Sequence, residues 1–338
     1  MENKKYSLTE VKSKANDFLN NKKDVNETTF LNYRTSFNYF IYYLTNISKE
    51  EYLGTDNKEM IIEGFQGSLF KGFKYKIEDN ERTVKAKANG VNTHVRRIKT
   101  FLNKSLGLKV DSDSVKDLKV TKPKYKSLSK EEIELLIKEC SNKWKNEEIA
   151  VRTSTLIRFL FNTAFRIEEA LGILTSNIYE DGSNYYVKIQ EKGKAKGELT
   201  EVTISENTFN LINDYINLKK VPSDYVFSST KPSAELEGKS KKYNRENFNK
   251  AIRDLASYVD LKYKGTKIND KPVNISKTVA NNSSHVFRHS KATYLLNVKK
   301  EDVVTVKEIL RHNSIDSTLI YLNPEEEAIN KVRISNDI

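Results

Sequence analysis

The sequence predicts a mainly helical protein with a small β-sheet, in which an all-α N-terminal domain precedes an α+β domain. Its length of 338 residues is typical of two domains. Apolar residues recur at helical spacing along much of the chain, whereas the runs 185–190 and 199–204 have the β-branched and aromatic content of strands. A basic, proline-containing segment separates the two halves. We therefore expect a helical domain over 1–120, a linker over 121–128 and an α+β domain with a C-terminal tail over 129–338.

The first domain is predicted to begin with three apolar-faced helices. Ser7 and Glu10 have the spacing of a capping box, so the first helix begins there. A second helix over 27–44 has a stripe of Phe and Tyr that we assign to the core. A third helix is expected over 58–73, although two glycines weaken it.

A fourth helix is predicted between Thr83 and Val110, where basic residues are frequent and acidic residues are absent. Apolar residues of this stretch form one packing face, so the other face can offer cations to phosphates. A basic face that is merely solvated is the alternative, and the length of the acid-free stretch argues against it. With the linker, this segment gives the expected phosphate-contacting residues Lys85, Lys87, Arg96, Arg97, Lys99, Lys122, Lys124 and Lys126.

The second domain is predicted to open on a helix, because 129–132 forms another capping box. Helices are expected over 153–162, 207–218 and 245–259, with the two strands between the first and second of these. Residues 260–282 show no clear periodicity and are predicted to form a loop or an insertion.

Composition restricts the partner and the compartment. The 58 Lys and Arg against 46 Asp and Glu give a net charge of +12, which favours an anionic partner such as nucleic acid. The alternative is that the excess of lysine only keeps the protein in solution. One cysteine, Cys140, excludes an internal disulfide and fits a reducing compartment. We expect a cytoplasmic protein without a membrane span, since no apolar run reaches about 18 residues. The phosphate-loop motif of ATP-binding proteins is absent.

The segment 284–321 contains the densest group of residues able to do chemistry. Three of the four histidines lie in it, namely His285, His289 and His312. His285 and Arg288 are three residues apart and share a helix face. Tyr321 follows His312 at a distance that fits a turn and a short helix. A single tyrosine is weak support because the chain has 18, and a single H-x-x-R is usually a surface pair.

Together these residues resemble the tyrosine recombinase (phage integrase) family. The resemblance rests on H-x-x-R, on L-x-H-x-S-I-x-x-T-x-x-Y from Leu310 to Tyr321, and on an upstream arginine box over 162–171. The family usually has glycine where this chain has Arg311, which either alters the turn or adds a phosphate contact. The family's catalytic lysine lies in a hairpin, which here is 191–197.

The resemblance implies a catalytic role for each residue of this set. Tyr321 attacks a DNA phosphodiester, Arg166 and Arg288 hold the non-bridging oxygens, and Glu169 orients Arg166. His285 is the general base and His312 supports the phosphate. Lys192 is the best match for the general acid, with Lys194 and Lys196 as alternatives and Lys194 also as a DNA contact. The expected catalytic residues are therefore Arg166, Lys192, His285, Arg288, His312 and Tyr321, with no metal and no cofactor.

The resemblance also implies the assembly. A core-binding domain and a catalytic domain are expected to form a clamp around double-stranded DNA, in the two-domain layout of Cre and Xer proteins. Four protomers would join two recombination sites through a Holliday junction, and an accessory directionality factor would fit this scheme. The C-terminal tail either docks on a neighbouring protomer or folds back. A mobile-element integrase is favoured over Xer-like dimer resolution, and the alternatives are a type IB topoisomerase, a catalytically silent DNA-binding relative and a general nucleic-acid binder.

Overall fold

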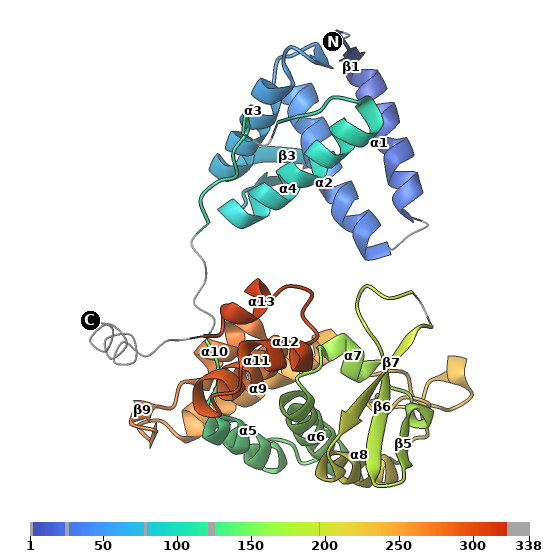
Figure 1. The fold of residues 1–338 in the computed structure, drawn as a ribbon, viewed down its shortest axis with the longest axis vertical. Coiled ribbons are helices and arrows are strands. Elements are labelled where there is room, and N and C mark those ends of the chain that lie inside the picture. The colour runs from blue at the N-terminus through green and yellow to red at the C-terminus, as the bar shows by residue number, and fades with distance from the viewer. Residues whose placement is uncertain are drawn as a thin grey trace, which may run out of the picture. The chain divides into compact units, whose positions relative to one another are not determined.

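The computed structural model describes residues 3–23, 27–77, 80–111, 113–120, 126–195 and 197–322. The chain divides into two compact units, Met1–Pro123 and Lys124–Ile338 (Figure 1). Within the described residues, none of the helices combines the length and the apolar character that crossing a membrane requires. The division falls inside the segment predicted as the linker.

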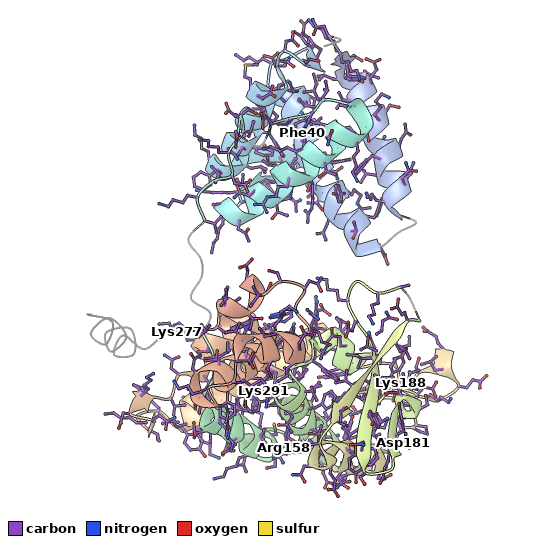
Figure 2. All side chains as sticks on the ribbon, viewed as in Figure 1. Phe40, Arg158, Asp181, Lys188, Lys277 and Lys291 are labelled. Atoms are coloured by element: carbon purple, nitrogen blue, oxygen red, sulfur yellow. The ribbon has the colours of Figure 1, made fainter. Side chains whose placement is uncertain are left out.

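The first unit is mainly helical and contains two antiparallel two-stranded ribbons, β1–β2 and β3–β4. Its elements in chain order are β1 Lys5–Ser7, α1 Leu8–Lys23, α2 Glu27–Asn46, β2 Tyr52–Gly54, α3 Lys58–Lys71, β3 Phe73–Ile77, β4 Asn80–Val84, α4 Ala88–Phe101 and the π-helical turn η1 Leu102–Leu106. The predicted capping box is present, because Ser7 N donates to Glu10 Oε2 at 2.8 Å. Aromatic rings fill the core; Phe40, marked in Figure 2, packs on Phe65 at 5.2 Å between centroids.

The ribbons are additions to the all-helical domain that we predicted. α3 ends at Lys71 rather than Phe73 because Gly72 has a φ of 98°, a backbone conformation that only glycine adopts without strain. Phe73 then begins β3, where Phe73 and Tyr75 both lie against the ring of Tyr39. The fourth helix begins at Ala88, so Lys85 and Lys87 precede it.

The second unit combines helices with one three-stranded antiparallel sheet of order β5–β6–β7. Its elements in chain order are α5 Lys130–Lys143, α6 Glu147–Thr163, α7 Ile167–Leu171, η2 Thr175–Asn177, β5 Ile178–Asp181, β6 Asn184–Gln190, β7 Leu199–Ile204, α8 Glu206–Leu218, η3 Ala234–Leu236, α9 Arg245–Lys262, β8 Lys267–Ile268, β9 Lys271–Pro272, α10 Ile275–Asn282, α11 His285–Thr293, η4 Tyr294–Val298, α12 Val303–Leu310 and α13 Asp316–Leu319. The two predicted strands pair from Tyr185–Ile204 to Gln190–Leu199. β5 adds a strand that we did not predict.

α11 is held in the middle of this unit. Val286 and Phe287 are fully buried in the larger core, and the hydroxyl of Ser290 accepts a 2.8 Å hydrogen bond from Leu128 N. The other side of the helix faces a smaller apolar cluster that contains Ala292, Leu310 and Tyr321. α11 is therefore fixed between two cores, which gives its polar residues a rigid support.

The prediction of a loop over 260–282 is wrong. α9 runs on to Lys262, a short β8–β9 hairpin follows, and α10 covers Ile275–Asn282. The carboxylate of Asp260 accepts hydrogen bonds from Ile275 N at 2.7 Å and Ser276 N at 2.9 Å. This cap reaches the start of α10 from another helix, and Asn274 at the N-cap position makes no capping hydrogen bond with its own side chain.

Candidate active site

Arg166 is fixed at the junction between α6 and α7. Ala164 ends α6 with a φ of 55°, and Arg166 then precedes the first turn of α7. Glu169, 3% exposed, accepts from Arg166 N at 2.9 Å and from its Nη1 at 2.8 Å. Burial opposes the charge of Glu169, but the ion pair with Arg311 and the bonds from Arg166 outweigh burial and lower its pKa. The predicted contact between Glu169 and Arg166 is present.

Arg288 holds two helix ends together from α11. Its guanidinium donates from Nη1 to the carbonyl of Ala164 at 2.7 Å and from Nη2 to the carbonyl of Leu310. These carbonyls end α6 and α12, where no further intrahelical partner exists. Burial, followed by the charge of Arg166, lowers the pKa of Arg288 to about 10. Even so, Arg288 stays protonated at neutral pH.

His312 is placed by the turn that ends α12. Arg311 takes the left-handed conformation, with φ 51° and ψ 54°, and His312 N donates to Lys307 O at 3.1 Å. Its Nδ1 lies 2.8 Å from the hydroxyl of Thr318, a fully buried residue of α13. Burial and the charges of Arg288 and Arg166 lower the pKa of His312 to about 4, so it is neutral at pH 7.

Tyr321 is buried, with 5% of its surface exposed, and its hydroxyl lies 2.6 Å from Nδ1 of His289. Its carbonyl accepts from Asn297 Nδ2 at 2.8 Å, and the rings of Tyr321 and His312 lie 6.3 Å apart between centroids. Burial and the neighbouring charge of His285 lower the pKa of His289 to about 4. His289 is thus a residue of the site to which the sequence assigned no role. Its only signal was the crowding of histidines in this segment.

Lys192 lies just beyond β6 in the hairpin to β7 and is exposed. His285 begins α11 and is also exposed, yet its pKa is lowered, first by partial desolvation and then by the charges of Arg288, Arg166, Arg245 and Lys192. Lys192 therefore lies within electrostatic reach of the site. Lys194 is turned to Glu198 at 3.6 Å, and Lys196 lies outside the described residues.

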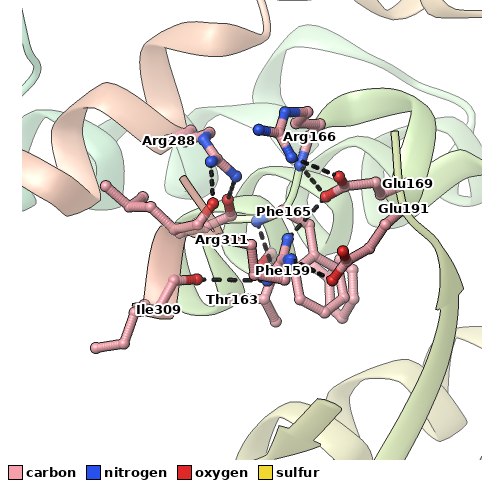
Figure 3. A network of polar contacts seen from close by, with 11 residues as sticks. Phe159, Thr163, Phe165, Arg166, Glu169, Glu191, Arg288, Ile309 and Arg311 are labelled. Carbon is pink, nitrogen blue, oxygen red and sulfur yellow. Dashed lines mark hydrogen bonds and ion pairs between the residues drawn. The ribbon is translucent and has the colours of Figure 1, made fainter. Parts of the chain in front are cut away.

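The side chain of Arg311 contacts both Glu169, which binds Arg166, and Glu191, at the start of the hairpin (Figure 3). Its Nη2 donates to Glu169 Oε2 at 2.7 Å, and its Nε lies 3.4 Å from Glu191 Oε1. Of the two expectations for this position, an altered turn is wrong, because the backbone is left-handed as a glycine would be. The phosphate contact stays a prediction, and in this structure the guanidinium faces two carboxylates.

The expected phosphate-contacting residues of the first unit differ in how free their charges are. Lys85 and Lys87 are exposed, and Arg96 is exposed but paired with Asp117. Arg97 donates to Asn32 O at 3.2 Å and Lys99 to Val115 O at 2.7 Å, so both help to hold the fold.

In the second unit Lys126 is exposed. Lys122, Lys124 and the C-terminal tail lie outside the described residues. In the part of the chain that is described, no group of three or more His, Cys, Asp or Glu side chains is placed to bind a metal ion.

Comparison with known proteins identifies the family. Residues 126–328 match the model of the Phage integrase family. Tyrosine recombinase XerC of Rickettsia bellii is 24% identical over 320 residues, which are 93% of this chain and 92% of that protein. A probable integrase/recombinase protein of Methanocaldococcus jannaschii is 29% identical over 180 residues, and these span 53% of this chain and 47% of that one.

Solved structures share the fold. The XerH site-specific recombinase bound to its difH substrate has a TM-score of 0.60 at 16% identity, covering 96% of this chain and 84% of that chain. The Tn1549 transposon integrase in complex with transposon right end DNA has a TM-score of 0.65 at 13% identity, covering 98% and 100%. The order of the motifs, the match over 126–328 and the common fold agree, and the chain belongs to the phage integrase family of tyrosine recombinases.

Proposed function

We propose that this protein is a site-specific DNA recombinase that cleaves and rejoins strands through a 3′-phosphotyrosyl intermediate formed on Tyr321. The observation that carries the proposal is the convergence of chain segments far apart in the sequence. Arg288 contacts both the end of α6, next to Arg166, and the end of α12, next to His312. The ring of Tyr321 lies beside that of His312.

The arginines suit the charge that develops at phosphorus. Attack on a phosphodiester places additional negative charge on the non-bridging oxygens, and planar guanidinium groups bind such oxygens with two parallel donors. Arg166 is partly exposed, with 27% of its side chain accessible, so one edge faces Glu169 while the rest can meet a phosphate. Arg288 already supplies two donors to helix ends, which holds its remaining edge in one orientation.

Proton transfer completes the proposed reaction. The Tyr321 oxygen forms the bond to phosphorus while the bond to the 5′ oxygen breaks. The phenolic proton passes to neutral His285, and Lys192 gives a proton to the leaving 5′ oxygen. In the free chain the Tyr321 hydroxyl is held at His289, so the tyrosine leaves that contact before it attacks. Rejoining is the same sequence reversed, and the bond energy stays in the phosphotyrosyl link.

The proposed partner is a double-stranded DNA recombination site. Relatives of the same fold are described with DNA, XerH with difH and the Tn1549 integrase with transposon DNA. The net charge of +12 supports an anionic partner for this chain. We further propose a homotetramer on two sites, with an accessory factor setting direction.

For the biological role, we propose integration or excision of a mobile element, with dimer resolution as the alternative. The alignment with XerC over 93% of this chain supports the alternative. A plasmid that carries two copies of the site distinguishes strand exchange from the simple relaxation expected of a type IB topoisomerase.

A covalent-trapping assay tests the chemistry. The protein is incubated with nicked suicide duplexes that scan the DNA flanking its own gene, and the products are run on a denaturing gel beside Tyr321→Phe. We expect a slower band in wild type only, carrying label from the 3′-phosphate side. DNA binding without any such band across the scan would support the catalytically silent alternative. A band that survives in Tyr321→Phe would assign the nucleophile to another residue.

A further inference from the structure

Arg311 occupies a backbone position that disfavours it. It follows α12 in the left-handed region, with φ 51° and ψ 54°, where a side chain adds strain that glycine avoids. Leu310 before it is buried, and its carbonyl is taken by Arg288. A small, flexible residue would serve the turn at least as well, so any compensation for the strain must come from the contacts of the side chain.

The side chain is buried among acidic and aromatic partners. Only 14% of it is exposed. Nη2 donates to Glu169 at 2.7 Å, Nε lies 3.4 Å from Glu191, and the guanidinium carbon stands 4.6 Å from the centre of the Phe165 ring. The two carboxylates are 2% and 18% exposed. Ion pairs at such burial are far less screened than surface pairs. Among the described residues Arg311 Nε makes no hydrogen bond, so its contact with Glu191 is an attraction between charges.

The two carboxylates lead to two different parts of the site. Glu169 on α7 also binds Arg166. Glu191 is the residue between β6 and Lys192, at the base of the exposed hairpin. A single guanidinium therefore touches the group that orients Arg166 and the group next to Lys192 (Figure 3).

We propose that Arg311 is a positioning residue that clamps the base of the β6–β7 hairpin to the Arg166–Glu169 pair and so sets where Lys192 delivers its proton. This rests on the proposed function, in which Lys192 is the general acid. Since both carboxylates already engage the guanidinium, Arg311 acts through them rather than as a phosphate ligand. The hairpin has no other described ion pair to the remainder of the unit, because the pair Lys194–Glu198 lies within it.

The test uses a leaving group that needs no acid. In a suicide duplex with sulfur in place of the bridging 5′ oxygen, the departing thiolate needs no proton, because a thiol such as that of cysteine has a pKa of about 8.5. We expect Arg311→Gly and Glu191→Gln each to slow cleavage of the oxygen substrate by about 10- to 100-fold, as for groups that orient a catalytic residue. On the sulfur substrate both variants should return to within about 3-fold of wild type, as should Lys192→Ala.

A matched control lies in the same hairpin. Glu198→Gln removes an exposed carboxylate, 57% accessible, that does not contact Arg311. The cleavage rates of both substrates should stay at the wild-type value. Equal slowing of both substrates in Arg311→Gly would overturn the proposal, because it would indicate damage to the arginines or the fold. Wild-type rates in Arg311→Gly and Glu191→Gln would overturn it as well.

Hydrogen exchange gives a readout that does not depend on catalysis. In the free protein, Arg311→Gly and Glu191→Gln should speed amide exchange in the peptide over 190–199 while α6 and α11 keep their protection. Unchanged exchange there would contradict the clamp. If wild type cleaves neither substrate while exchange responds as expected, the proposed function fails and the clamp stands.

Discussion

The substitution Glu169→Gln isolates the electrostatic centre of the site. Glu169 as a residue is 3% exposed, and its carboxylate accepts three hydrogen bonds from two arginines at 2.7–2.9 Å. Each bond to a charged group contributes roughly 1.5–3 kcal/mol, and removing one partner of a buried ion pair costs about 3–5 kcal/mol. Glutamine keeps the shape and one acceptor oxygen but directs an amide donor at the arginines. We therefore expect a loss of about 3–5 kcal/mol from the free energy of unfolding.

The same change should slow strand cleavage, because Arg166 loses the group that orients it. We expect about 10- to 100-fold in the single-turnover rate of covalent-complex formation. Urea unfolding gives the stability and the trapping assay gives the rate, both at pH 7.5. The adjacent Glu168→Gln is the control, since that carboxylate is 54% exposed and its pairs with Lys242 and Arg245 are longer, at 3.5 and 3.7 Å. A Glu169→Gln protein that matches the control in both assays would refute the assigned importance of this carboxylate.

Two further outcomes concern stability. The pKa values of His289 and His312 are lowered to about 4 in the folded chain, so below pH 6.5 the unfolded chain binds protons that the folded chain does not. The stability present above pH 6.5 is therefore lost as the pH falls toward 4. The urea midpoint should be lower at pH 5.0 than at pH 7.5, and this difference should shrink in His289→Gln. Ser290→Ala leaves the buried Leu128 N–H without its 2.8 Å acceptor and should cost about 1–3 kcal/mol by urea unfolding, whereas the exposed Ser141→Ala should stay within about 0.5 kcal/mol.

Local patterns in the sequence were sufficient for much of the fold. The capping boxes at Ser7 and Ser129 are present, and both predicted strands pair in the catalytic half. The same patterns failed where a distant residue supplied what the neighbours lacked. α10 is capped by Asp260 from another helix, whereas the side chain of Asn274 at its N-cap position makes no capping bond.

The candidate site shows the same division. The motifs over 284–321, through their resemblance to the family, grouped Arg288 and His312 with Tyr321, and the structure places the three residues close together. Spacing along the chain could not find His289 as the partner of the Tyr321 hydroxyl, since that contact depends on how η4 and α13 return the chain to α11. Nor could it assign the side chain of Arg311, whose partners lie 142 residues away for Glu169 and on a separate hairpin for Glu191.

The positive charges of the site affect the protonation of its histidines. Burial lowers the pKa of His312 and of His285 most, and the charges of Arg288 and Arg166 lower both further, so each cation that would bind phosphate also helps to keep the neighbouring imidazoles neutral. The positive charges of the three arginines repel one another. The fold accommodates them because the carboxylate of Glu169 lies between Arg166 and Arg311, and because Arg288 donates to two backbone carbonyls. On the proposed function, a phosphate bound here adds negative charge, which raises the proton affinity of both imidazoles. His285 would thus become a stronger base only once substrate is present, whereas in the free chain the hydroxyl of the buried Tyr321 lies against His289.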